Sequence, residues 1–230
     1  MEKLLPLFLW ALFLSAGLTA QPDKNQKFAA AAYLGLNAAQ IDGDYYFGYN
    51  KTGLRFGLET QYLISPKLYA TVGVGFNQMG SRATKSERND SGGKALALRL
   101  TAVEIPLLIN YRLGNKTATG KKENYQLFRS CIAQFGVSFT RLTGYRIART
   151  GRTNDLPVSE NFVSVENQFE DFDVHLMVGL AIPVSLQTSI MIQHGRSLLG
   201  LYRPEVERIE AAVLPLFPYY LTLGVKHAFY

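Results

Sequence analysis

The sequence predicts an all-β protein, an eight-stranded antiparallel up-and-down transmembrane β-barrel. Eight stretches alternate apolar and polar residues with period 2, and each is long enough for a tilted crossing of about ten residues. The connections between them alternate in length, as extracellular loops and periplasmic turns do. The final stretch, 219–230, alternates with His227 as the exception on its apolar face, and it must pair with the first strand, because lipid does not tolerate an open sheet edge.

The first 20 residues have the features of a secretory signal peptide. Lys3 gives a positive start, residues 4–14 form an apolar run, and small residues precede a cleavage site after Ala20. The run is too short to span a bilayer as a helix. We therefore expect residues 1–20 to be removed, residues 21–27 to form a short periplasmic segment, and residues 28–230 to form the barrel.

The composition fits this architecture and limits the classes of partner that the chain is expected to bind. The chain is 47% hydrophobic and 18% charged, which conceals the alternation, and its 13 Tyr and 14 Phe would supply aromatic girdles. A net charge of +6 is expected to meet anionic lipid headgroups. No basic block with interleaved aromatics indicates nucleic-acid binding. Cys131 is the single cysteine, so no intramolecular disulfide is possible, and its alternation predicts an outward-facing side chain.

The first four strands are predicted from the alternation, taken in order. The first is thin and rich in alanine, but Gly35 and Asn37 argue against a helix. The second and third flank a tight turn at Pro66, as in a hairpin. The fourth carries apolar residues on one face and Glu104 and Arg112 on the other. The expected strands are 28–37, 54–64, 68–77 and 98–113.

The last four strands follow the same pattern. The fifth places glutamine, glycine, serine and threonine on its inward face. The sixth is the cleanest, with Val, Leu and Ile opposing a face that contains Asp173 and His175. A turn at Pro183 leads to the seventh, and the eighth ends on two aromatic residues. The expected strands are 127–142, 172–182, 186–196 and 219–230.

The long connections set the expected orientation. Outer-membrane barrels have long outside loops and short periplasmic turns, so both termini are expected in the periplasm. A soluble eight-stranded barrel is the alternative, and it would bury the apolar face inside. We favour the membrane form, because the small and polar residues of the other face suit a narrow, filled lumen. The loops expected outside are 38–51, 79–97, 143–168 and 198–218.

Four segments of the chain also carry a family resemblance: Gly35-Leu-Asn37, Ile41-Asp-Gly-Asp44, Gly53-Leu-Arg-Phe-Gly57 and Glu104-Ile-Pro-Leu-Leu-Ile-Asn-Tyr111. They resemble the PorT-like outer-membrane β-barrel family of Bacteroidota, and the Glu-Ile-Pro-Leu segment is the most specific of them. The resemblance covers the chain after the signal segment and implies an eight-stranded outer-membrane barrel. The founding member is linked to a secretion system, but nothing in this sequence matches it beyond the shared barrel pattern, so that role is not transferred.

Charged residues on the inward face form the candidate site. A barrel of eight strands encloses only enough room for its own side chains, so acids and bases there should pair. We interpret them as a salt-bridged plug without stable conductance; a proton or ion path, or a buried catalytic cluster, is the alternative. The candidate lumen network comprises Arg55, Glu59, Glu104, Arg112, Asp171, Asp173, His175 and Lys226.

No motif points to catalysis, a cofactor or a metal. The best base for an outer-membrane hydrolase is His194, with Ser189 or Ser197 as conceivable nucleophiles, but no Gly-x-Ser-x-Gly elbow occurs. Gly73-Val-Gly75 indicates close packing rather than a cofactor loop. Asp42-Gly-Asp44 is better explained as a turn than as a Ca²⁺ site, because two carboxylates are too few.

The sequence therefore predicts a small, closed, non-porin outer-membrane barrel with a structural, adhesive or accessory-binding role through its extracellular loops. Its expected partners are outer-membrane lipid, the barrel-assembly machinery during insertion, and an unidentified protein or glycan at the loops. Two alternatives remain open. A component of a transport or secretion assembly would co-purify with partners, and a lipid-modifying outer-membrane enzyme would lose activity on His194→Ala.

Overall fold

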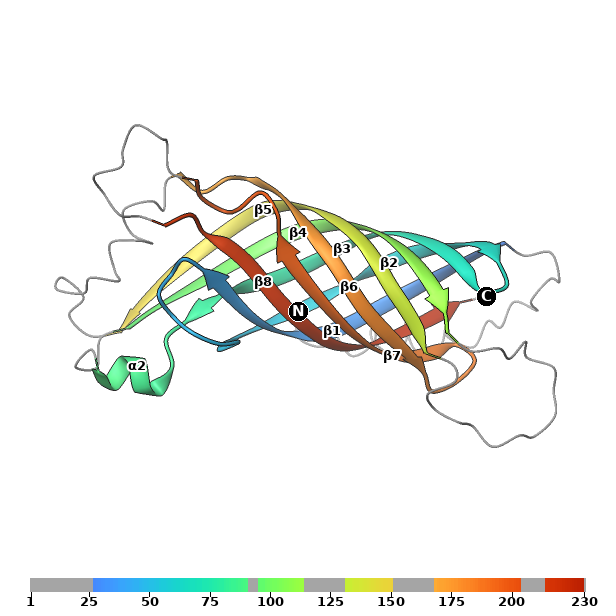
Figure 1. Cartoon of the computed structure of the whole chain (residues 1–230), viewed down its shortest axis with the longest axis horizontal. Helices are drawn as coiled ribbons and strands as arrows, with labels where there is room; N and C mark the ends of the chain where they lie inside the picture. The colour runs from blue at the N-terminus through green and yellow to red at the C-terminus, as the bar shows by residue number, and fades with distance from the viewer. Residues whose placement is uncertain (1–26, 91–94, 114–130, 151–167, 204–213, 230) are drawn as a thin grey trace, which may run out of the picture.

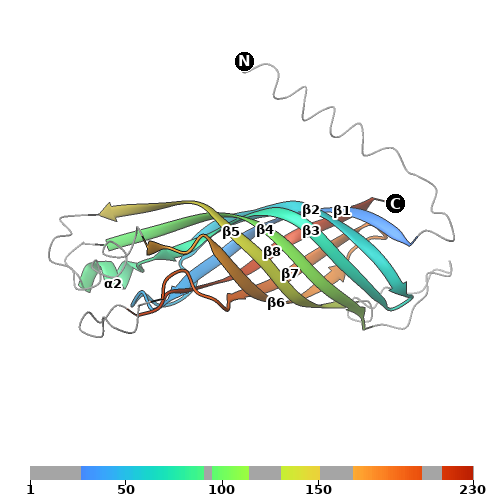
Figure 2. The ribbon, with the colours of Figure 1, turned by 90° about the horizontal axis from the view of Figure 1, so that it is seen from above.

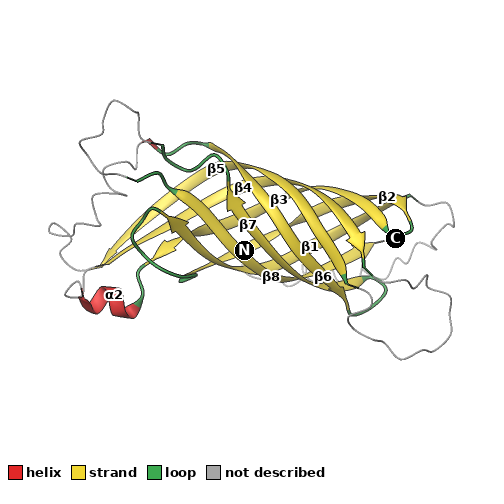
Figure 3. Ribbon diagram, in the orientation of Figure 1, coloured by secondary structure: helices red, strands yellow, loops and turns green. Residues whose placement is uncertain are grey.

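The structure, a computed structural model, describes residues 27–90, 95–113, 131–150, 168–203 and 214–229. The expected signal peptide 1–20 and almost all of the segment 21–27 lie outside these residues. Within the described residues no helix is long and apolar enough to cross a membrane, and α2 (Lys85–Asp90), red in Figure 3, has six residues.

Eight antiparallel strands form one closed barrel in chain order, with β1 paired to both β2 and β8 (Figure 1). The predicted fold class is confirmed. The strands are β1 (Phe28–Asp42), β2 (Lys51–Ser65), β3 (Leu68–Arg82), β4 (Ala95–Arg112), β5 (Ile132–Thr150), β6 (Phe172–Pro183), β7 (Thr188–Ser197) and β8 (Phe217–Phe229).

The last strand closes the barrel as expected. β8 pairs with β1 in continuous register from Ala30, opposite Phe229, to Asp42, opposite Phe217. On β8, Leu223 is 60% exposed on the outer face, whereas Thr222 is fully buried on the inner one. The apolar face therefore lies outside, and the soluble barrel with its apolar face inside is excluded.

The outer wall has the height of a bilayer core. Tyr219 and Phe229 lie on the same outward face at opposite ends of β8. At a rise of about 3.3 Å per residue and a strand tilt of about 40°, they are about 25 Å apart along the barrel axis. That distance matches the apolar band of outer-membrane barrels, flanked by aromatic girdles.

The two ends of the barrel differ. β2 joins β3 and β6 joins β7 by short turns at one end, where β8 also finishes, whereas α2 lies at the other (Figure 2). We assign the α2 end as extracellular, because outer-membrane barrels carry their longer loops there. The connection 114–130, at the end with the turns, lies outside the described residues.

Several strands extend further at the extracellular end than the sequence predicted. β1 continues to Asp42, β3 to Arg82 and β5 to Thr150, so the expected loops 38–51, 79–97 and 143–168 were drawn too long. Above the lipid the outward face no longer needs to be apolar, so the alternation that marks a strand weakens. β5 also contains a bulge: Leu142 pairs with Ala102 and Gly144 with Thr101. Thr143 therefore has no paired residue on β4, and the inward and outward positions are reversed above it.

An apolar cluster fills the extracellular mouth of the barrel. Leu96, Leu98 and Leu100 of β4 point inward there. Leu201 and Leu216 cover them, and backbone hydrogen bonds join Leu201 to Leu216 and Leu216 to Tyr202. The mouth is therefore sealed by a small hydrophobic core above the polar lumen.

Cys131 does not face outward as expected. It directly precedes β5 and is buried, with 8% of its surface exposed. Its carbonyl accepts a hydrogen bond from the backbone N–H of Leu113. The predicted fifth strand began at residue 127, but β5 begins at Ile132, so the alternation did not extend to Cys131.

Candidate functional site

Glu104 on β4 is the centre of the lumen. Its side chain is fully buried and pairs with Arg55 of β2, with 2.7 Å between Arg55 Nε and Glu104 Oε1. The hydroxyl of Tyr33 donates to the same oxygen at 3.0 Å, and Asn77 Nδ2 donates to Oε2 at 2.9 Å. The Arg55 guanidinium also lies between the rings of Tyr33 and Tyr220. Both charges are thus neutralised and hydrogen-bonded inside the barrel.

Neutral amides extend this pair across the lumen. Arg55 Nη1 donates to Gln193 on β7, Gln193 donates to Gln134 on β5 at 2.8 Å, and Gln134 donates to Asn110 on β4 at 2.7 Å. On the other side, Asn37 on β1 donates to Asn77 at 2.7 Å. The result is a continuous hydrogen-bonded layer that joins strands far apart in the sequence.

Two further pairs of ionisable side chains lie above and below this layer. Lys226 Nζ is 2.6 Å from Glu59 Oε1 toward the periplasmic end, and both side chains are buried. Toward the mouth, His175 Nε2 is 3.5 Å from Asp173 Oδ2. Asp173 also accepts the backbone N–H of Leu199, at 3.2 Å, which fixes the segment after β7.

Six of the eight candidate residues thus lie inside the barrel. The predicted inward position is wrong for Asp171, and Arg112 is only half-buried. Asp171 precedes β6 and is exposed, because the strand begins only at Phe172 and the mouth opens to solvent there. Arg112 is the last residue of β4 and is half-buried at the periplasmic rim. Neither forms an ion pair with a described residue.

The inward side chains of the described residues are largely buried against one another. A cavity of about 20 Å³, room for about one water molecule, lies beside His175, Asp173 and Leu201 at the mouth. Sequence reasoning missed the uncharged members of the lumen because it selected charges alone. Their signal was their inward position in the same alternation: Tyr33, Asn37, Asn77, Asn110, Gln134, Gln193 and Tyr220.

Asp44 attaches the loop 43–50, which joins β1 to β2, to the inside of the barrel. This buried carboxylate accepts hydrogen bonds from Ser81 Oγ, from Gln40 Nε2 at 3.0 Å and from the backbone N–H of Tyr46 at 2.8 Å. Burial raises the pKa of Asp44 to about 7, although the bonds from Ser81 and Tyr46 oppose that rise. The loop is therefore attached to the barrel by a carboxyl group that titrates near neutral pH.

The same loop presents aromatic side chains. Tyr45, Phe47 and Tyr49 are 49%, 78% and 43% exposed, and Tyr45 adopts a left-handed backbone conformation, with φ 64°. Phe47 N–H donates to Glu87 Oε1 of α2 at 3.0 Å, which fixes the centre of the loop. The rings of Tyr45 and Phe47 are thus held outward on an anchored backbone.

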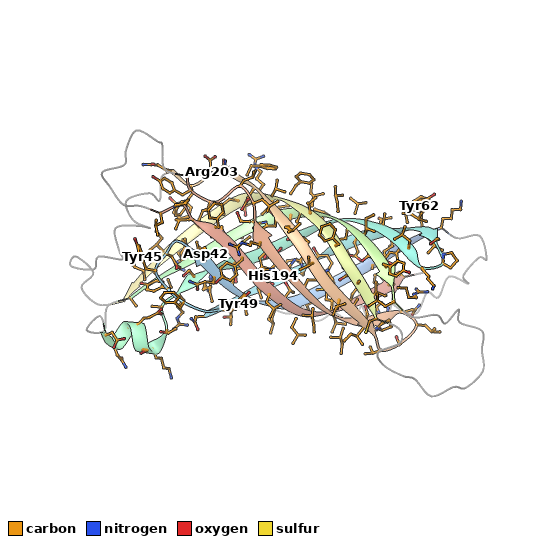
Figure 4. The ribbon with its side chains drawn as sticks, viewed as in Figure 1. Asp42, Tyr45, Tyr49, Tyr62, His194 and Arg203 are labelled. Atoms are coloured by element: carbon orange, nitrogen blue, oxygen red, sulfur yellow. The ribbon has the colours of Figure 1, made fainter. Side chains whose placement is uncertain are left out.

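Tyr49 folds back against the barrel wall, beside Asp42 and His194 in Figure 4. Its hydroxyl is 3.1 Å from His194 Nε2, and its ring meets Tyr219 edge-on with centroids 5.2 Å apart. Next to it, Arg196 Nη2 pairs with Asp42 Oδ2 at 3.0 Å, across β8. This exposed cluster fixes the end of the loop on β7 and β8.

The geometry gives little support to a hydrolase site at His194 or to a metal site at Asp42 and Asp44. His194 faces outward and contacts Tyr49, whereas Ser197 is buried inside and its Oγ accepts the N–H of Gly200. Ser189 lies at the far end of β7, opposite Pro183. No group of three or more His, Cys, Asp or Glu side chains able to hold a metal ion occurs in the described part of the chain. Asp42 points to Arg196 while Asp44 points inward, as the turn interpretation expects.

Comparison with known families decides the assignment. Residues 19–201 match the family described as outer membrane protein beta-barrel domain. The chain belongs to this family. The protein is therefore a small eight-stranded β-barrel of the bacterial outer membrane. No curated protein sequence matches the chain.

Solved structures of small outer-membrane barrels are similar in shape. Ail, the attachment invasion locus protein of Yersinia pestis, shares 9% identity at a TM-score of 0.44, covering 89% of this chain and 100% of Ail. CarO of Acinetobacter baumannii shares 11% identity at 0.43, covering 88% and 99%. Neisserial surface protein A shares 12% at 0.39, covering 88% and 97%.

Proposed function

We propose that this barrel is a closed, non-porin scaffold that presents the loop 43–50 to a protein or glycan outside the cell. The observation that carries the proposal is the pair of properties found in that loop. The backbone of the loop is fixed by the buried Asp44, and the side chains of Tyr45, Phe47 and Tyr49 are exposed. Exposed aromatic rings on a rigid frame supply contact area at low entropic cost, which favours a binding role.

The filled lumen supports the scaffold half of the proposal. Arg55 and Glu104 neutralise each other at the centre, amides bridge the remaining width, and the apolar cluster covers the mouth. A permeating ion would have to break hydrogen bonds among buried groups. We therefore expect no stable conductance from the folded chain.

We also propose that the chain is not an enzyme and is a PorT-like barrel from Bacteroidota. The separation of His194 on the outer face from Ser197 on the inner face supports the first statement. The segment from Glu104 to Tyr111 supports the second, since its glutamate is the centre of the lumen network. Activity toward outer-membrane lipids that is lost on His194→Ala would contradict the first.

Whole-cell binding tests the loop. Cells displaying the barrel are applied to immobilised glycans and extracellular-matrix proteins, and retention is compared with that of the double variant Tyr45→Ser/Phe47→Ser. We expect retention on at least one surface to fall about tenfold or more, because aromatic anchors dominate such contacts.

Tyr62→Ser is the matched control. Tyr62 is similarly exposed, at 40%, but lies at the opposite end of the barrel in Figure 4. Cells with this variant should bind like the wild type. Equal losses in both variants, or no retention of wild-type cells on any surface, would contradict the proposed role.

A further inference from the structure

Four arginines gather on the outer wall at the extracellular end of β3, β4 and β5. They are Arg82, Arg99, Arg141 and Arg146, here called the arginine patch. All four are exposed on the outward face of their strands. The three strands are neighbours, and the paired ends of β4 and β5 continue past the barrel body toward the α2 end (Figure 1).

The patch concentrates like charge without compensation. Arg99 on β4 lies directly opposite Arg146 on β5, and Arg82 is diagonal to Arg99, because Arg82 pairs with Ala97 and Gly80 with Arg99. Like charges directly opposite each other destabilise a sheet. Within the described ranges no carboxylate forms an ion pair with any of the four. Arg196, at the same end of the barrel, is paired with Asp42.

The patch sits just above the apolar band. On β4 the outward face runs from Tyr111 through Ile109, Ile105 and Val103 before it reaches Arg99. At a rise of about 3.3 Å per residue and a tilt of about 40°, Arg99 is about 30 Å above Tyr111 along the axis. The apolar band is about 25 Å tall, so Arg99 and Arg146, which pair with each other, lie at the level of the lipid headgroups. Arg141 pairs with Val103, about 20 Å above Tyr111, and lies near the upper edge of the band.

The adjoining strands make the same transition. On β3 the outward face changes from Phe76 to Arg82, and on β5 it changes from Phe139 to Arg141 and Arg146. A ligand that fills this surface is therefore apolar below and anionic above. Guanidinium groups bind phosphate with paired, charge-assisted hydrogen bonds.

We propose that the arginine patch binds the phosphate groups of a phosphorylated glycolipid in the outer leaflet of the outer membrane. Its acyl chains lie along the apolar residues beneath, and its phosphates offset the repulsion between Arg99 and Arg146. This surface is separate from the loop 43–50, so the glycolipid site stands whether or not the loop binds a partner outside the cell.

Native mass spectrometry of the folded chain in detergent micelles, titrated with phosphorylated lipid A, tests the site. We expect the double variant Arg99→Ser/Arg146→Ser to bind about tenfold or more weakly than the wild type, since each loses charge-assisted bonds to phosphate. Lipid A stripped of its phosphates should bind wild type and variant equally weakly. Arg196→Ser is the matched control, because it removes one exposed arginine already paired with Asp42, and it should stay within about twofold of the wild type.

Thermal unfolding gives a second readout, in which the stability difference between wild type and double variant should change when lipid A is added. Without lipid A, the double variant should be at least as heat-stable as the wild type, because the repulsion between Arg99 and Arg146 is gone. With lipid A, the wild type should gain more stability. Equal affinity of the wild type for dephosphorylated lipid A, undiminished binding by the double variant, or complete displacement of lipid A by millimolar inorganic phosphate would each overturn the proposal.

Discussion

Glu104 shows how a charged residue is kept inside a membrane protein. Its carboxylate is fully buried and satisfies Arg55, Tyr33 and Asn77 at the same time. An unpaired charge at this position would be costly, whereas the pair as a whole is close to neutral in energy. Glu104 therefore acts mainly as the counter-charge that offsets the cost of burying Arg55 in the lumen.

Removing one partner should expose this dependence. We expect Glu104→Leu to lower the free energy of unfolding by about 3–5 kcal/mol, because it leaves Arg55 buried without a counter-charge. Urea unfolding in detergent micelles measures the loss. The double variant Arg55→Met/Glu104→Leu should recover most of it, and a single variant as stable as the wild type would refute the interpretation.

Asp44 should make stability depend on pH. Its pKa in the folded chain, about 7, lies above the ordinary value of 3.8, so its contribution is fully present below about pH 4 and is lost as the pH rises through 7. Between pH 5 and pH 8 we expect the wild type to lose about 2 kcal/mol more than Asp44→Asn in urea unfolding. Asp42→Asn, which changes an exposed carboxylate two positions away, should keep the wild-type dependence; if it behaves like Asp44→Asn, the assignment to Asp44 is wrong.

At the scale of the strand, glycines on the inner face make room for the network. A Cβ added at Gly75 of β3 would lie 2.1 Å from the Tyr33 hydroxyl, the group that donates to Glu104. A Cβ added at Gly144 of β5 would meet nothing within 4 Å. Close approach of Tyr33 thus explains Gly75, and a Cβ added at Gly73 would lie 2.8 Å from the carbonyl oxygen of Leu58, in agreement with the packing interpretation.

The two glycines give a matched comparison. We expect Gly75→Ala to cost about 1–3 kcal/mol, because Tyr33 must move away from Glu104. Gly144→Ala should change the free energy of unfolding by less than about 0.5 kcal/mol. Unfolding midpoints in urea for the two variants provide the measurement, and equal values would show that the inner face of β3 is not close-packed.

The strands also show where sequence reasoning succeeds and stops. Period-2 alternation predicted all eight strands, because lipid requires one apolar face and a narrow lumen requires the other to be small or polar. It underestimated β1, β3 and β5 at their extracellular ends, where no lipid enforces the pattern. It also could not foresee the bulge at Thr143, which depends on pairing with β4.

The whole molecule combines a polar lumen with an apolar cap. The charges in the lumen were readable from their positions, but their pairing was not, because partners such as Arg55 and Gln193 lie far apart in the chain. The cap formed by Leu98, Leu201 and Leu216 was missed because two of these residues lie in a stretch that reads as a loop. The barrel is thus closed by two independent layers.

Conductance in a planar lipid bilayer tests this closure most directly. The chain is refolded in detergent, and a shift in gel mobility on heating verifies that it is folded before it is added to the bilayer. We predict no single-channel steps, because in the described part of the chain the hydrogen-bonded layer around Glu104 and the apolar cluster at the mouth both fill the lumen. Regular, reproducible conductance steps from the folded chain would contradict the closed barrel and make the lumen, rather than the loops, the place to look for function.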